Sequence, residues 1–417
     1  MKLNELNPWW TESKVKPEMV PAVRRELFFN LQKDLSRRMI TVVVGLRRVG
    51  KSTLIFQLIE DLIKSNVSPL QILYCTFDEP NFQSRRIEEI LEEYSSLTGI
   101  DFRKEKVYLF LDEIQKAKEW VASTKLLYDH YHNIKIVVSG SASLPILAEA
   151  KKSLAGRAMY YELKPLHFKE FLQLKGTKFD ENKPALYEEL LKKEFRAFLY
   201  RPFPALVKEA DILFIKNYIR EAVIEPILLK DIPKEFKDVD ILLLEKLVNL
   251  FLGQPGQIIS IDDLAKELGR AKATLYKALF YLEFSFLIKR VLNFRPSLRA
   301  ASRKLSKIYP YHPCLTLPYE VSEDKYAESL VGFELEAKYY WRDKEKEIDF
   351  LKESLPVEVK YSSEIRKNDL RWVEFFLEKY GGSLKIKKAF LITRDVEGQK
   401  GNIFWMPLWK FCFYGLD

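Results

Sequence analysis

The segment at residues 45–52 constrains the fold of this chain more than any other feature. It has the spacing GxxxxGK[ST], follows the β-branched apolar run Ile40–Val44 and opens the amphipathic segment Lys51–Lys64. Glycines let the backbone curl so that its N–H groups point inward, and a helix N-terminus adds a positive dipole. Strand, loop and helix in this order predict a phosphate-binding loop at the carboxyl end of a parallel sheet.

Each position of this loop has an expected role toward a nucleotide. The Lys51 ammonium would reach the β- and γ-phosphates, and the Ser52 hydroxyl would bind Mg²⁺. Backbone N–H groups and the first helical turn would complete the site at Gly45, Arg47, Arg48, Val49, Gly50 and Thr53. We therefore expect ATP and Mg²⁺ as cofactors. A glycine-rich turn that binds no ligand is the alternative.

Two carboxylates follow the apolar run at residues 107–111, where a buried strand is expected. Ligands of open α/β sheets bind at the carboxyl ends of the strands, so Asp112 and Glu113 would lie near the phosphate loop. Asp112 would hold Mg²⁺ through water, and Glu113 would polarise the attacking water. An acidic pair that ends a strand without a catalytic role is the alternative.

Two further residues extend this candidate site. Ser139 ends the apolar run at residues 134–138, and its hydroxyl could bind the attacking water or the γ-phosphate. Arg157 follows a short predicted helix and is a candidate arginine finger, acting within its own chain or across a subunit boundary of a homo-oligomer. The alternatives are a serine that starts a loop and a surface arginine.

Apolar runs alternate with helical segments in the first 164 residues, which predicts an α/β ATPase core with a parallel sheet covered on both faces. The expected strands are residues 40–44, 71–77, 107–111, 134–138 and 159–163, and the expected helices are residues 51–64, 87–96 and 119–131. A helical lid is expected at residues 165–237 and a three-helix module at residues 238–309. A proline-rich linker (Pro310, Pro313, Pro318) then leads into a C-terminal α/β domain at residues 310–417.

The three-helix module has the pattern of a helix-turn-helix. Ser260 caps a first helix, Gly269 ends it, and a second helix begins near Ala271. The segment that follows, residues 288–309, is basic, includes Lys307 and has no acidic residue. We expect a winged helix that binds DNA through Arg270, Lys272, Lys277, Arg295, Arg299, Arg303 and Lys304. A winged helix that packs against protein is the alternative.

Apolar and polar residues alternate in two stretches near the C-terminus, residues 347–351 and 356–360, which a short turn joins. If the turn centres on Glu353 and Ser354, Asp349 pairs directly with Glu358, about 5 Å apart at Cβ, and Lys360 shares their face. Two carboxylates that hold Mg²⁺ and a lysine that orients or deprotonates water are the groups that metal-assisted phosphodiester cleavage requires. A solvent-facing hairpin with an accidental ion pair is the alternative.

Two resemblances follow from these motifs. The runs at residues 45–53, 111–115, 139–141 and 154–157, with the opening Asn7-Pro8-Trp9-Trp10, resemble the archaeal and bacterial AAA+ ATPase family. That resemblance implies that a domain of unknown function, here expected to be of the DUF4143 type, follows the ATPase module. The Asp349, Glu358 and Lys360 arrangement is similar to the PD-(D/E)xK nuclease superfamily. This implies a restriction-endonuclease-like fold in which Glu328, on an upstream helix, completes the metal ligands.

The composition of the chain indicates the class of its partner and its cellular compartment. The net charge of +9 indicates an anionic partner such as DNA, or a lysine- and glutamate-rich surface of the thermophile type. Three separated cysteines give no disulfide framework, the first ten residues lack the apolar core of a secretory signal, and no apolar run approaches the ~20 residues of a membrane span. We expect a cytoplasmic, DNA-associated ATPase without a membrane partner. The rival is a signalling switch that ATP toggles, in which the other domains bind partners or act as scaffold.

Overall fold

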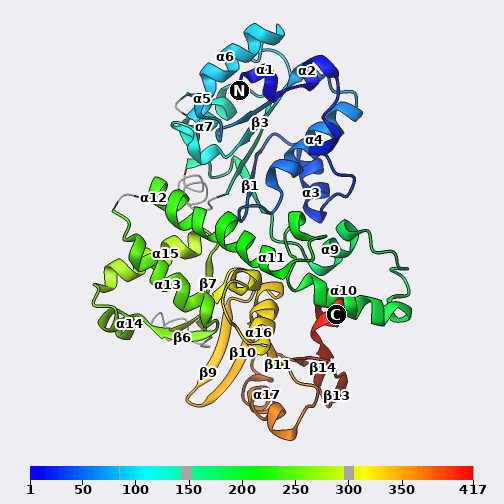
Figure 1. Ribbon diagram of the computed structural model, residues 1–417, viewed down its shortest axis with the longest axis vertical. Helices are drawn as coiled ribbons and strands as arrows, with labels where there is room; N and C mark the ends of the chain where they lie inside the picture. Colours follow the sequence, from blue (N-terminus) through cyan, green and yellow to red (C-terminus); the bar gives the residue numbers. More distant parts are fainter. Residues whose placement is uncertain (84, 142–152, 237, 295–304, 417) are drawn as a thin grey trace. The chain divides into compact units, whose positions relative to one another are not determined.

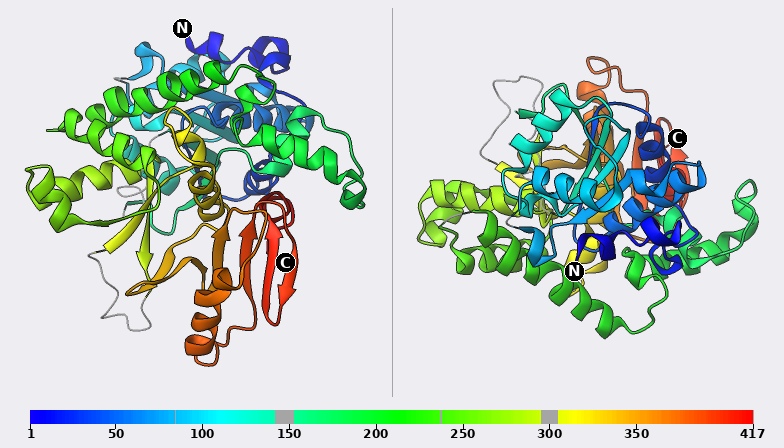
Figure 2. Two further views of the ribbon diagram at one scale, coloured as in Figure 1. Left: turned by 60° about the horizontal axis from the view of Figure 1, so that its bottom comes forward. Right: turned by 90° about the horizontal axis from the view of Figure 1, so that it is seen from above.

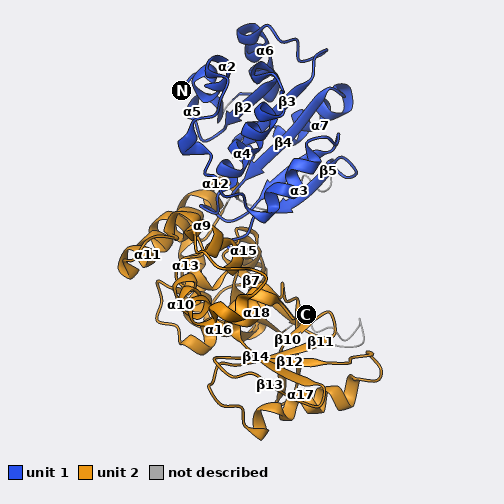
Figure 3. Cartoon of the chain, turned by 90° about the vertical axis from the view of Figure 1, so that its right-hand side faces the viewer, with its two compact units in different colours: residues 1–166 blue, residues 167–417 orange. Residues whose placement is uncertain are grey.

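A five-stranded parallel sheet forms the centre of the first of two units, Met1–Leu166 (Figures 1 and 3). The computed structural model describes residues 1–83, 85–141, 153–236, 238–294 and 305–416. The strands lie in the order β2-β3-β4-β1-β5, with bounds β1 Ile40–Val44, β2 Ile72–Thr76, β3 Val107–Asp112, β4 Ile134–Gly140 and β5 Ala158–Glu162. β1 and β4 are buried along their whole length, as expected of parallel strands covered on both faces. The predicted α/β class is confirmed.

Helices connect these strands at the positions of the amphipathic segments. Among them α4 and α7 both pack against β4, the middle strand of the sheet. The helices of the unit are α1 Leu3–Leu6, α2 Trp9–Glu12, η1 Pro17–Met19, α3 Glu26–Asp34, α4 Lys51–Lys64, η2 Pro69–Gln71, α5 Pro80–Gln83, α6 Ile87–Thr98, η3 Ile114–Lys116 and α7 Trp120–His130. The helix predicted at residues 51–64 has these bounds in the structure.

The N-terminal turns cover the edge strand β2. The side-chain amide of Asn7 donates to the carbonyl of Tyr74 and accepts from its N–H, at 2.8 and 2.7 Å. The indole N–H groups of Trp9 and Trp10 both donate to the carbonyl of Ile72. The aromatic opening of the sequence thus satisfies backbone groups that an edge strand would otherwise present to solvent.

Packing as well as turn geometry requires glycine at the start of the phosphate loop. A Cβ atom at Gly45 would lie 2.2 Å from the carbonyl oxygen of Leu163, just beyond β5. Gly50, at the N-terminus of α4, has a φ of 101°, in the region that glycine adopts without strain. The two glycines of the motif are therefore fixed by a neighbouring strand and by the entry into the helix.

The second unit, His167–Asp417, contains a nine-stranded mixed sheet (Figure 2). Its order is β13-β14-β12-β11-β10-β9-β7-β8-β6. Pairs β7–β9, β11–β12 and β12–β14 are parallel, and the other pairs are antiparallel. The bounds are β6 Gln257–Ser260, β7 Ile288–Asn293, β8 Leu305–Pro310, β9 Tyr339–Asp343, β10 Lys346–Lys352, β11 Leu355–Lys360, β12 Ala389–Thr393, β13 Gly398–Lys400 and β14 Ile403–Pro407.

Helices of two kinds accompany this sheet. The first group fills the region predicted as a lid: α9 Phe168–Lys175, η5 Pro184–Tyr187, α10 Glu188–Phe198, η6 Pro204–Leu206, α11 Ile212–Tyr218, η7 Ile219–Ile224, η8 Ile227–Asp231 and α12 Ile232–Glu235. The second group is interleaved with the strands: α13 Ile241–Gly253, α14 Ile261–Glu267, α15 Lys272–Phe284, η9 Pro313–Thr316, α16 Glu323–Glu334, α17 Lys367–Tyr380 and α18 Leu408–Tyr414. None of the helices within the described ranges is long and apolar enough to cross a membrane.

One sheet runs through the two modules that the sequence separated at residues 309 and 310. α13, β6, α14 and α15 precede the antiparallel pair β7–β8, and β7 also pairs with β9 at Leu292 and Tyr339. The proline-rich segment predicted as a linker forms η9, whose four residues are all buried. The prediction of a linker was therefore wrong, because prolines that end a strand and start a 3-10 helix resemble linker prolines in sequence.

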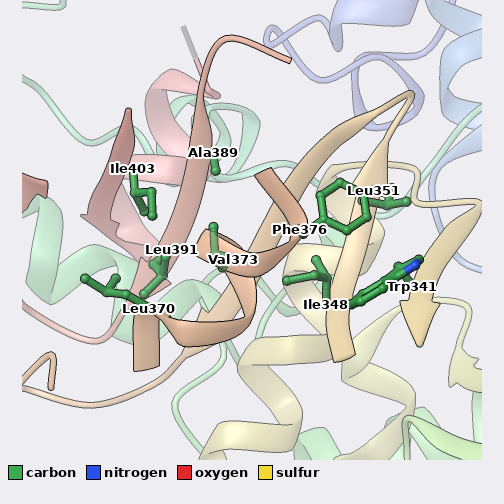
Figure 4. Packing of buried hydrophobic residues seen from close by; sticks show 9 residues of the cluster. All are labelled: Trp341, Ile348, Leu351, Leu370, Val373, Phe376, Ala389, Leu391 and Ile403. Carbon is green, nitrogen blue, oxygen red and sulfur yellow. The ribbon is translucent and has the colours of Figure 1, made fainter. Parts of the chain in front are cut away.

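The core of the C-terminal part lies where α17 packs against β10 (Figure 4). Its apolar residues recur at helical spacing on α17 and come from inward positions on the strands. They are Trp341, Ile348, Leu351, Leu370, Val373, Phe376, Ala389, Leu391 and Ile403. Burial of this set fixes which face of β10 points away from α17, and that face carries the predicted carboxylates.

Candidate functional site

The strand order brings the predicted nucleotide-binding residues to one edge of the first sheet. β4 lies between the strand that precedes the phosphate loop and the strand that ends in Asp112. Val43 on β1 is paired with Ser139 on β4, and Leu111 on β3 is paired with Val138. Because the strands are parallel, all of their carboxyl ends meet at this edge, as the sequence predicted.

Asp112 is the centre of a hydroxyl network. Its Oδ2 accepts from the Ser52 hydroxyl at 2.5 Å and from the Tyr74 hydroxyl at 3.2 Å, and its Oδ1 accepts from the Ser139 hydroxyl. Burial and the nearby Glu113 raise the pKa of Asp112, and the serine hydroxyls oppose that shift. Ser52 and Asp112, both predicted as Mg²⁺ ligands, are therefore adjacent. The Ser139 hydroxyl contacts Asp112, and its role toward water or phosphate stays a prediction.

Glu113 has an unusual backbone and two polar partners. Its φ is 53°, in the left-handed region that non-glycine residues seldom adopt. Its Oε2 accepts from the Gln115 amide at 2.7 Å and from the Ser141 hydroxyl at 2.9 Å. Neither partner was predicted from the sequence, although Ser141 lies in the Ser139-Gly140-Ser141 run that ends the expected strand.

The phosphate loop is held from within and from outside. The Lys51 ammonium donates to the carbonyls of Gly45 and Leu46, at 2.9 and 3.0 Å, and its side chain is buried. Arg25 donates to the carbonyls of Val49 and Lys164, at 3.1 and 2.9 Å. Arg25 was missed because it lies outside every motif. Of the other predicted loop contacts, Arg47 and Thr53 are half-buried, Arg48 is exposed with a φ of 67°, and Val49 is buried.

Arg157 lies at the amino ends of the strands, opposite the phosphate loop. Its carbonyl accepts from the N–H of Ile40, the first residue of β1, and its guanidinium pairs with Asp129 at 2.7 Å. The length of β1 therefore separates it from the phosphate loop, roughly 15 Å at ~3.3 Å per residue. The alternative in which Arg157 acts as a finger within its own chain is excluded by this placement, whereas the alternative across a subunit boundary is compatible with it.

The C-terminal hairpin has the predicted register. Phe350 pairs with Val357 and Lys352 pairs with Leu355, which places Asp349 opposite Glu358. The Asp349 N–H donates to Glu358 Oε2 at 3.2 Å, and the Val359 N–H donates to Asp349 Oδ2 at 3.0 Å. Each carboxylate thus binds the backbone of the other strand.

Glu328, predicted from a resemblance, reaches the same cluster from α16. Its Oε1 accepts from the Tyr309 hydroxyl at 2.6 Å, and its Oε2 pairs with Lys325 at 2.8 Å. Lys360 pairs with Glu358 at 2.8 Å. Burial and the adjacent Asp349 raise the pKa of Glu358 to about 8, although Lys360 and a backbone N–H lower it.

The predicted Mg²⁺ site of Glu328, Asp349 and Glu358 is not assembled. Within the described residues, no group of three or more His, Cys, Asp or Glu side chains is arranged to hold a metal ion. The ammonium of Lys307 lies between Glu328 and Asp349 instead, 3.4 and 3.2 Å from their oxygens. The sequence reasoning counted Lys307 among the basic residues near DNA, whereas its side chain is 4% exposed.

The predicted DNA-contacting residues fall into three groups. Arg270 pairs with Asp240 at 3.0 Å and Lys272 pairs with Asp262 at 2.7 Å, while Lys277 is exposed on α15. Two aromatic side chains of α15, Tyr276 and Phe280, are also exposed, at 47% and 44%. The remaining four lie outside the described residues: Arg295, Arg299, Arg303 and Lys304.

Two family models match the chain. Residues 37–172 match the AAA domain, and residues 195–316 match a domain of unknown function, DUF8612, which covers most of the regions predicted as a lid and a winged helix. The DUF4143 type of the C-terminal domain stays a prediction. With the strand order and loop geometry above, the first match shows an AAA-type P-loop ATPase fold in this part of the chain.

Similar proteins include two uncharacterized proteins of the archaeon Methanocaldococcus jannaschii. One is 30% identical over 65% of this chain and 60% of its own length, and the other is 28% identical over 75% and 71%. The match thus spans about 60% of the length of the first relative. Solved structures that resemble the chain include a Walker-type ATPase of Pyrococcus abyssi, 16% identical with a TM-score of 0.41, which covers 73% of this chain and 98% of its own. Another is the ORC2 protein of Aeropyrum pernix, 14% identical with a TM-score of 0.37, which covers 74% and 95%.

Proposed function

We propose that the first unit binds ATP with Mg²⁺ and hydrolyses it. The observation that carries this proposal is the 2.5 Å contact between Ser52 and Asp112 beside the phosphate loop. A hydroxyl and a carboxylate held together at a helix N-terminus are the donor set that Mg²⁺ uses next to nucleotide phosphates. The Lys51 ammonium and the loop N–H groups would hold the phosphates, and bound Mg²⁺ would neutralise charge that develops on them.

Glu113 is the proposed general base of this reaction. Its carboxylate is held by Gln115 and Ser141, so it must exchange at least one of these donors for the attacking water. Ser139 keeps Asp112 in place by its hydroxyl contact, and it would therefore act as a positioning residue.

Steady-state ATP hydrolysis and nucleotide binding test this proposal. Lys51→Ala should lose nucleotide binding, because the ammonium supplies the charge opposite the β- and γ-phosphates. Glu113→Gln should bind ATP as the wild type does and lose roughly 10²–10⁴-fold in turnover. Lys64→Ala, at the exposed end of the same helix, is the matched control and should change neither. Wild-type turnover by Glu113→Gln would contradict the assignment.

Arg157 is proposed to complete this site in a neighbouring copy of the chain. The support is its position at the edge of the sheet opposite the phosphate loop, which suits a contact between subunits of a homo-oligomer. A mixing experiment tests the proposal. Arg157→Ala and Glu113→Gln chains should each be inactive alone and should regain activity when mixed, because some interfaces then carry both intact groups. Arg37→Ala, an exposed arginine paired within its own helix region, serves as control.

We further propose a cytoplasmic protein whose ATP hydrolysis is coupled to DNA. The support is the order α13, β6, α14, α15, β7 and β8, which is that of a winged helix with α15 as recognition helix, and the net charge of +9. The exposed Tyr276 and Phe280 on α15 favour a second candidate, in which this helix binds a protein partner and ATP toggles a switch.

ATPase rates with and without duplex DNA, at low salt, separate the two candidates. Stimulation by DNA that Lys277→Ala reduces supports coupling to DNA. Equal rates, together with no measurable DNA binding at low salt, would favour the switch.

A further inference from the structure

Lys307 is an internal cation at the centre of the C-terminal carboxylate cluster. Its ammonium lies 2.6 Å from Glu347, 3.2 Å from Asp349 and 3.4 Å from Glu328. An ammonium has three N–H donors, and three carboxylates surround this one. The face of the Tyr340 ring lies 5.6 Å away and adds a favourable contact with the cation.

The backbone of Lys307 is held on both sides. β8 lies between β7 and β6, and Lys307 is paired with Val291 on one side and with Ile258 on the other. Its side chain is 4% exposed. The strand that carries Lys307 is paired on both sides, and other side chains enclose the lysine, so its side chain has one direction available to it. This lysine therefore differs from a surface lysine that meets a carboxylate by chance.

The oxygens that a metal would need already accept hydrogen bonds. In Asp349, Oδ1 accepts from Lys307 and Oδ2 accepts from the Val359 N–H. In Glu358, Oε1 pairs with Lys360 and Oε2 accepts from the Asp349 N–H. Mg²⁺ requires oxygen ligands at about 2.0–2.1 Å in octahedral geometry, so it would have to displace the ammonium and at least one backbone donor.

We infer that the Lys307 ammonium takes the position of the divalent cation in this nuclease-like site. The domain therefore keeps the hairpin, the helical glutamate and the lysine of a PD-(D/E)xK arrangement, but the cation that holds them together belongs to the chain. Metal-dependent cleavage does not follow from this geometry. Instead, the cluster ties β8 to α16 and β10 and so fixes the hairpin β7–β8 to the C-terminal sheet.

Mn²⁺ titration of the full chain, followed by electron paramagnetic resonance, tests the inference. Asp112→Asn is used as background, because it removes the carboxylate of the nucleotide site. In this background, adding Asp349→Asn should leave Mn²⁺ binding unchanged, because the site that retains Lys307 binds no Mn²⁺. Adding Lys307→Met should create one Mn²⁺ site per chain, with a dissociation constant of about 10⁻⁴–10⁻³ M, which is the range of weak oxygen-ligand sites. Adding Asp349→Asn should then abolish it.

Lys325→Met is the matched control for this experiment. Lys325 contacts the same Glu328, but its side chain is 43% exposed and it does not contact Asp349 in the described structure. Its loss should create no Mn²⁺ site. A folded Lys307→Met chain that binds no Mn²⁺ would overturn the inference.

The background chain gives a result even where Lys307→Met does not fold. Mn²⁺ binding by a chain that retains Lys307, lost on Asp349→Asn, would also overturn the inference. If Lys307→Met folds when Mn²⁺ is added and is unfolded without it, the metal has replaced the ammonium, as the inference requires.

Discussion

The nucleotide site of the first unit and the carboxylate cluster of the second contain the same chemical groups in different pairings. Lys51 donates to carbonyls of its own loop, and Asp112 accepts from three hydroxyls and one backbone N–H, none of which carries a charge. Lys307 donates directly to carboxylates. Neutral donors leave the negative charge of a carboxylate available to an incoming cation, whereas an internal ammonium neutralises that charge. Residue composition alone therefore does not distinguish a site that is ready for a metal from one that is already neutralised.

The largest expected difference between the two sites is the effect of removing each lysine. Lys307→Met should lower the free energy of unfolding of the second unit by about 3–5 kcal/mol, because it leaves buried carboxylates without their counter-charge. Lys51→Met should cost less, roughly 1.5–3 kcal/mol, the value of hydrogen bonds that a charged group makes. Urea unfolding followed by tryptophan fluorescence measures both. Equal costs for the two lysines would contradict the comparison.

The two aspartates should respond differently to amide substitution. Asp112→Asn should leave stability nearly unchanged, because the amide oxygen can still accept from Ser139 and the Glu113 N–H, while nearby hydroxyls can accept from the NH₂ group. Burial also raises the pKa of this carboxyl in the wild type. Asp349→Asn should cost about 1–3 kcal/mol, since an amide NH₂ would face N–H donors that cannot reverse. In the wild type, burial opposes ionisation of Asp349, yet Lys307 and Lys360 hold its pKa below the usual value. Thermal unfolding of both variants gives the measurement, and a destabilised Asp112→Asn would argue against neutral pairing.

A smaller effect is expected from pH. Glu358 has a pKa of about 8 in the folded chain, against 4.5 for the ordinary side chain, so between these values the folded state binds more protons than the unfolded state. Stability of the second unit should therefore fall as pH rises through this window, by up to about 1.4 kcal/mol per pH unit. Glu358→Gln should flatten the curve. Urea midpoints between pH 5 and 8 measure it, and an unchanged slope in Glu358→Gln would assign the pH dependence to another group.

The smallest expected effect concerns DNA. Each phosphate contact contributes a slope of about −0.9 to the dependence of log affinity on log salt, so Lys277→Ala should flatten that slope by roughly this amount. Neutralising Arg299, Arg303 and Lys304 together should flatten it further. Lys352, exposed on β10, is the matched control and should leave the slope unchanged when replaced by Ala. Fluorescence anisotropy at several salt concentrations measures the slope, and no change in Lys277→Ala would remove α15 from the DNA-binding surface.

Much of this molecule follows from local sequence patterns, and the remainder depends on strand order. The phosphate loop is predictable because glycine spacing, a strand and a helix lie within 25 residues. The hairpin of Asp349 and Glu358 is predictable because a slip of one residue would turn its apolar residues away from the core. Lys307 is not predictable in this way, because it reaches Asp349 from a strand 42 residues earlier, through a sheet whose order is not sequential. The position of Arg157 does follow from the sequence, because a residue directly before a predicted parallel strand lies at the amino end of the sheet.

The sharing of Lys307 among three acids has a consequence for how this part of the chain can evolve. A mutation that removes the lysine takes the shared counter-charge from three carboxylates, and a mutation that removes one acid leaves the lysine with fewer acceptors. Positions 307, 328, 347 and 349 are therefore energetically coupled, and their substitution effects should not add. Lineages that lose the lysine should either replace the acids as well or recruit a metal ion in its place. Among relatives, the identity of this one residue would then separate chains that keep an internal cation from chains that depend on an external one.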